Sequence, residues 1–202
     1  MGTPVRVVIE VGKKRCFASA IDWPGWSRSG KTEADAIEHL AEYANRYANA
    51  VGAKLPKSPT FEVVERVKGD ATTDFGAPGT IAECQRDEPT KAERKKLAKL
   101  VNASWEFLGE VADTAPEVLT KGPRGGGRDT DAVVEHVENA EHAYARKLGV
   151  ITRNNEDVRA SIITALETGT AEKPATWPPN YAAMRIAWHV LDHAWEIQDR
   201  SE

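Results

Sequence analysis

The spacing of apolar residues changes once along this 202-residue chain, and that change most constrains its fold. Over residues 4–11 and 15–22, apolar and polar residues alternate, as in strands that bury one face. From residue 90 onward, apolar residues recur at the spacing of amphipathic helices. We therefore expect a sheet in the first part and helices in the second.

The first part, residues 1–68, predicts a small α+β domain with an antiparallel sheet. The two alternating runs flank residues 12–14 (GKK), which indicates a β-hairpin. Thr32 is suited to cap a helix that extends to about Val51, because its hydroxyl can accept a first-turn N–H and acidic residues follow it. Residues 61–67 predict a further strand.

The rest of the chain predicts a linker and then an all-α domain. Residues 69–89 are rich in Gly and Pro without a sustained period, as in a linker. Within residues 90–202, we expect four helices, at about 91–113, 130–148, 156–167 and 180 to the C-terminus. Four amphipathic helices with mostly short connections favour an antiparallel four-helix bundle.

Composition excludes several classes of protein. Lys and Arg total 27 against 31 for Asp and Glu, and the net charge of -4 argues against nucleic-acid and membrane partners. No segment approaches the roughly 20 apolar residues of a membrane span, and no secretion signal is visible, so we expect a cytoplasmic protein. Cys16 and Cys84 lie too far apart for a thiolate zinc motif or a disulfide framework.

Three of the five histidines are predicted to face the interior of the helical part. His136 lies on the flank of the apolar stripe of its helix, whereas His142 lies opposite and should be solvated. His189 and His193 are four residues apart, so a helix stacks them on one side. Together with His136, they could hold one divalent ion and leave positions open, as in catalytic sites.

The same spacing also fits histidines without a metal. His189 and His193 could be partly buried side chains bonded to carbonyls or to Glu196, and spacing alone weighs the two interpretations evenly. Val190 stands where the HExxH motif of zinc proteases has its Glu, so metalloprotease chemistry is not expected.

Two segments of the helical part resemble a known family. Residues 136–141 (HVENAE) and 188–196 (WHVLDHAWE) resemble the DinB/YfiT-like superfamily, and the resemblance covers about residues 90–202. It implies a four-helix bundle in which these three histidines hold one divalent metal ion, zinc or nickel. It also implies a metal-dependent transferase, isomerase or hydrolase, with a small-molecule substrate or a low-molecular-weight thiol as partner.

Further side chains are candidates for roles at such a site. Glu196 could orient a ligand imidazole or move a proton, with a solvated carboxylate as the alternative. Arg128, Arg159 and Arg185 could bind an anionic substrate, although solvated surface arginines are the commoner outcome for each.

The first part resembles the HicB-like domain. Residues 22–26 (DWPGW) and 30–36 (GKTEADA) carry the resemblance, which covers about residues 4–67. HicB-like domains bind a toxin partner and precede a DNA-binding segment, but helices follow here, so we expect packing on the bundle or self-association. The alternative function is a non-enzymatic binding or regulatory module with a scaffold bundle.

A second apolar stripe on the last helix bears on that packing. The stripe lies opposite the histidines and consists of Met184, Trp188, Leu191 and Trp195. Two indoles left in water would form an unusual patch for a monomer, so this face should contact the first domain or another subunit, as in a homodimer.

Overall fold

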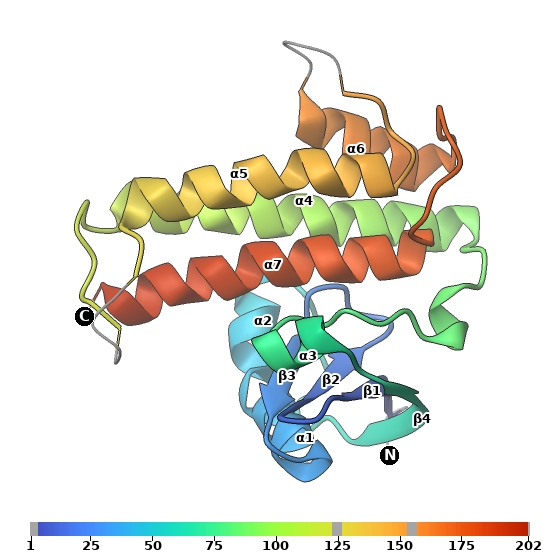
Figure 1. Ribbon diagram of the computed structural model, residues 1–202, viewed down its shortest axis with the longest axis horizontal. Coiled ribbons are helices and arrows are strands. Elements are labelled where there is room, and N and C mark those ends of the chain that lie inside the picture. The colour runs from blue at the N-terminus through green and yellow to red at the C-terminus, as the bar shows by residue number, and fades with distance from the viewer. Residues whose placement is uncertain (1–3, 123–126, 153–156, 202) are drawn as a thin grey trace.

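The computed structural model describes residues 4–122, 127–152 and 157–201, and in it a sheet at the N-terminus is followed by a layer of helices (Figure 1). The sheet has four strands in the order β3-β2-β1-β4. Their bounds are β1 Val5–Val11, β2 Cys16–Ala20, β3 Ser27–Gly30 and β4 Phe61–Lys68. β1 pairs antiparallel with β2, which confirms the predicted hairpin. The expectation of an antiparallel sheet was wrong, because β1 pairs parallel with β4 after the chain has crossed over through the helical segment between β3 and β4.

The predicted helix after Thr32 is two helices, α1 (Glu33–Glu42) and α2 (Ala44–Val51). The Thr32 hydroxyl accepts the Asp35 N–H and the Asp35 carboxylate accepts the Thr32 N–H, which confirms the cap. The break falls at Tyr43, whose ring packs against α7. β3 was not predicted, because its four residues (SRSG) carry no apolar alternation.

The segment predicted as a linker holds two short helices, α3 (Ala71–Phe75) and η1 (Glu83–Gln85). It is anchored to the sheet by Glu10, whose buried carboxylate accepts hydrogen bonds from the Thr73 hydroxyl and from the N–H groups of Gly79 and Thr80. The segment therefore covers part of the sheet rather than lying free of it.

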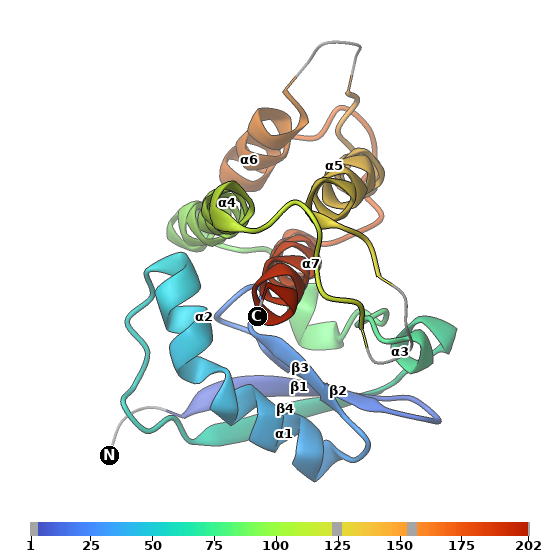
Figure 2. The same cartoon turned by 90° about the vertical axis from the view of Figure 1, so that its left-hand side faces the viewer.

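Four helices follow, α4 (Lys91–Thr114), α5 (Thr130–Lys147), α6 (Val158–Thr168) and α7 (Pro179–Arg200). They share one buried apolar cluster, and α4 and α5 each pack against both α6 and α7 (Figure 2). The predicted start of the third of them, at residue 156, lies outside the described residues. None of the described helices is long and apolar enough to cross a membrane.

α7 lies on the side of the helical layer that faces the sheet (Figure 1), and α4 also reaches the N-terminal part through its contact with α2. Leu191 and Trp195 belong to the apolar cluster of the sheet domain, and Trp188 packs edge-on against Phe17 of β2, with ring centroids 5.8 Å apart. The prediction that the second stripe contacts the first domain is therefore confirmed. Its role in self-association stays a prediction.

Gly25 shows how closely the sheet domain approaches α7. Its φ of +93° lies in the region that favours glycine, and a Cβ there would lie 2.8 Å from Leu191 Cδ1 and 2.9 Å from Ala187 Cβ. The Pro-Gly turn thus brings backbone directly onto the helix that carries two of the candidate ligands.

Candidate metal centre

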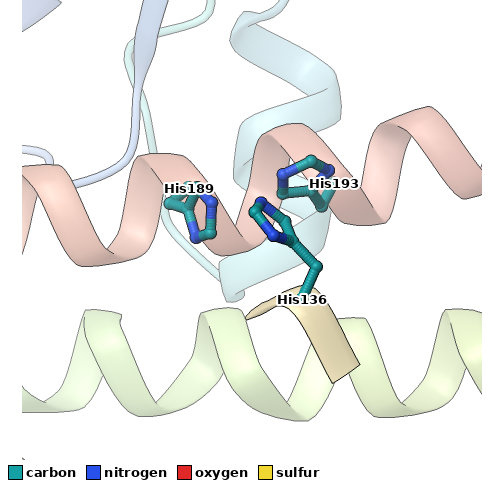
Figure 3. A group of neighbouring side chains, drawn as sticks. All are labelled: His136, His189 and His193. Carbon is teal, nitrogen blue, oxygen red and sulfur yellow. The ribbon is translucent and has the colours of Figure 1, made fainter. Parts of the chain in front are cut away.

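The structure brings His136 of α5 together with His189 and His193 of α7. One potential ligand nitrogen from each lies within 4.8 Å of the other two. Figure 3 shows the three rings turned toward one another, and the ring centroids are 4.7 to 5.2 Å apart. Zinc with bonds of about 2.0–2.1 Å needs ligand nitrogens roughly 3.3 Å apart, so side-chain rotations would complete the coordination.

Burial favours the neutral form of His136 and His189, which is the form of imidazole that binds metals. His189 is 7% exposed, and burial, reinforced by His193 and Arg185, lowers its pKa to about 2. Burial also lowers the pKa of the half-buried His136. Protons therefore compete little with a metal ion for these two nitrogens at neutral pH.

Glu196 fixes the ring of His193. The His193 Nδ1–H donates to Glu196 Oε2 at 2.8 Å, and the Glu196 Oε1 accepts from Arg200 Nη1 at 2.8 Å. The hydrogen bond from His193 holds the pKa of Glu196 below its usual value. With the proton on Nδ1, the free lone pair of His193 is on Nε2, as in the carboxylate–histidine–metal arrangements of known sites.

Arg200 was missed by sequence reasoning. It also donates to the backbone carbonyls of Thr120 and Arg128, at 2.9 and 2.7 Å, and so ties the end of α7 to the chain that leads into α5. The spacing of four residues between Glu196 and Arg200 was the signal that could have found the pair.

His189 has an unsatisfied atom. Its Nδ1 is buried and has no hydrogen-bond partner among the described residues. Leaving a buried polar group unpaired costs about 1–3 kcal/mol, which a bound ion or an ordered water would offset. The donor set, three imidazoles of which one has a buried nitrogen without a partner, therefore fits a divalent ion such as zinc or nickel.

The three candidate arginines differ in their surroundings. Arg159 pairs with the buried Glu141 at 3.0 Å and with Glu138 at 3.8 Å, so its charge is already compensated. Arg185 and the exposed Arg128 both contribute to lowering the pKa of His189, and so lie close enough to act on the histidines.

Two other side chains complete the description. His142 is exposed, as predicted, with Nδ1 3.4 Å from the Thr152 hydroxyl. The Tyr144 ring lies 5.6 Å from that of His189, centroid to centroid. Tyr144 lies on the apolar stripe of α5 together with Val133 and Val137, and nothing in its spacing distinguishes it from a core residue.

Comparisons of the chain with protein-family models, curated proteins and solved structures found no match. The two family resemblances noted in the sequence therefore stay predictions, and the function is inferred from the geometry of the three histidines.

Proposed function

We propose that this chain is a metal-dependent enzyme in which His136, His189 and His193 hold one divalent ion, zinc or nickel. The observation that carries the proposal is the convergence of three imidazole nitrogens from two helices within 4.8 Å. The unpaired His189 Nδ1 and the carboxylate that orients His193 support it.

We further propose that the helical part is a DinB-like four-helix bundle and that the sheet domain is HicB-like. The shared core of α4 to α7 supports the first assignment, as does the origin of the ligands, one from the second of these helices and two from the last. The strand pair, the capped helix after Thr32 and the further strand β4 support the second.

Three neutral nitrogen ligands leave coordination positions open to water, to a substrate or to a low-molecular-weight thiol. A divalent ion there would act as a Lewis acid and favour the deprotonated form of the ligand that it binds. The protein contributes orientation: Glu196 holds the proton on His193 Nδ1, and Arg200 holds Glu196.

Metal analysis of protein purified without a His tag tests the ligand assignment. After incubation with zinc or nickel and dialysis, wild type and the control His142→Ala should retain about one equivalent of metal, whereas His136→Ala, His189→Ala and His193→Ala should each retain less than about a tenth. Wild-type protein without metal, or His189→Ala at full occupancy, would overturn the proposal.

A second measurement separates the enzyme from a non-enzymatic binding module. The zinc-loaded protein should accelerate transfer of a low-molecular-weight thiol to a chromogenic electrophile, and His189→Ala should abolish the acceleration. Stoichiometric metal without acceleration for thiol transfer, isomerisation or hydrolysis would contradict the enzyme proposal and favour the binding module.

A further inference from the structure

Arg185 lies on the same face of α7 as the two histidines of that helix. Arg185, His189 and His193 follow one another at intervals of four residues, which stacks their side chains along one row. Each interval advances about 6 Å along the axis, so the guanidinium is about one turn from the nearest imidazole. Its effect on the pKa of His189 agrees with that proximity.

The guanidinium of Arg185 has no acidic partner. Among the described residues, no carboxylate lies within ion-pair distance, and Nη1 is buried without a hydrogen-bond acceptor. The neighbouring Arg159 and Arg200 do have acidic partners, Glu141 and Glu196, although Nη2 of Arg200 is also buried without an acceptor. Arg185 is partly buried, and a buried guanidinium nitrogen without an acceptor or a counter-charge is costly, which points to a missing anion.

Two aromatic rings flank this cation. The guanidinium carbon lies 4.7 Å from the ring centre of Trp188 and 5.6 Å from that of Tyr144. The Tyr144 hydroxyl lies within hydrogen-bonding reach of Arg185, whose guanidinium donates, so the O–H of Tyr144 is left to donate to a ligand. The surroundings therefore offer donors and rings, and the carboxylate of Glu196 is already taken by His193 and Arg200.

We propose that Arg185 binds the carboxylate of a small organic acid whose other end occupies an open position at the three histidines. The guanidinium fork matches a carboxylate through two parallel hydrogen bonds, which a lysine could not provide. The spacing of about one helix turn limits the acid to a few bonds between its carboxylate and its metal-binding group. This inference rests on the proposed metal site.

A pair of thiols of equal chain length, one ending in a carboxylate and the other in a methyl group, tests the proposal. Cobalt(II), which three imidazoles also accept, gives a thiolate charge-transfer band that reports binding at the metal. In wild type, 3-mercaptopropionate should bind about tenfold or more tightly than 1-propanethiol. In Arg185→Gln and in Arg185→Met, which keeps an apolar stem beside Trp188, the preference should fall to about twofold.

Arg86→Gln is the matched control, because Arg86 is 52% exposed and pairs with Glu83 away from the site. It should keep the wild-type preference. Cobalt binding and thermal unfolding of each variant are measured first, so that a folding defect in one Arg185 variant leaves the other as the test. Wild type that binds cobalt but shows no preference, or an Arg185 variant that keeps it, would overturn the inference alone, whereas absence of cobalt binding would overturn the proposed metal site.

Discussion

The two buried faces of α7 differ in how completely their charged side chains are paired. On the face toward the sheet domain, Arg28 pairs with Asp192 at 2.9 Å and lies 3.9 Å from the centre of the Tyr43 ring, and Arg46 pairs with Asp199 at 2.7 Å. On the face toward α5, Arg185 has no acidic partner among the described residues.

The face toward α5 also carries the unpaired His189 Nδ1. The face toward the sheet has an unpaired atom too, Trp195 Nε1, but a neutral indole N–H is less costly to leave unpaired than a nitrogen of a charged guanidinium. Packing against the sheet domain therefore explains the residues on the face of α7 toward the sheet without a ligand. On the face toward α5, the unpaired donors and potential metal-ligand atoms indicate a site at which a bound ligand would supply the missing partners.

The largest expected effect is on the face toward the sheet. Trp195→Ala should lower the free energy of unfolding by about 3–5 kcal/mol, because it removes a fully buried indole between the two layers. Chemical denaturation measures the loss. Val118→Ala, at a position 70% exposed, is the control and should change stability by about 0.5 kcal/mol or less. If Trp195→Ala had a comparably small effect, the claim that packing on this face stabilises the fold would be wrong.

On the face toward α5, we expect a bound metal ion rather than packing to change the free energy of unfolding. Zinc at about 100 times its dissociation constant should raise the free energy of unfolding of wild type by about 2.7 kcal/mol, and removal by a chelator should reverse the gain. His136→Ala and His189→Ala should lose this gain, whereas His142→Ala should keep it. An equal gain in His189→Ala would show that the zinc binds elsewhere.

Glu196→Gln should weaken zinc binding by about tenfold, because the neutral amide orients His193 less well and leaves its ring less basic. Competition with a chromophoric chelator measures the affinity. Glu106→Gln, an exposed change on α4, should leave it unaltered. If the two variants bound zinc equally well, Glu196 would have no part in positioning the ligand.

The smallest effect is expected for the half-exposed ion pair on the sheet side. Arg46→Met should cost about 1 kcal/mol of stability, because the pair with Asp199 is partly solvated and the stem can still pack on Tyr43. Zinc affinity should not change, and a double-mutant cycle with Asp199→Asn measures the coupling. A change in zinc affinity as large as that of Glu196→Gln would show that the two faces are coupled.

Local spacing made much of this arrangement predictable. The period-two runs predicted the hairpin, the helical stripes predicted α4 to α7 and both faces of α7, and the inward His136, His189 and His193 meet as expected. These features depend on residues close together in sequence, where the geometry of strands and helices determines which side chains share a face.

The features that sequence reasoning missed depend on contacts between distant segments. The break at Tyr43 coincides with packing against Trp195, with ring centroids 5.1 Å apart, and β3 is defined by its pairing with β2. That Arg185 has no acidic partner among the described residues is likewise visible only once the carboxylates of those residues have been placed. In the sequence, the spacing of Tyr43 and Arg185 cannot be told from that of ordinary core or surface residues.

Zinc-edge X-ray absorption of the tag-free, zinc-loaded protein tests the central claim most directly. We predict three imidazole nitrogens at about 2.0–2.1 Å from the zinc, with one or two further ligands that bind through nitrogen or oxygen. His189→Ala should not retain zinc and should therefore give no such spectrum. A sulfur-containing shell, a shell without imidazole scattering or a wild-type spectrum from His189→Ala would contradict the claim.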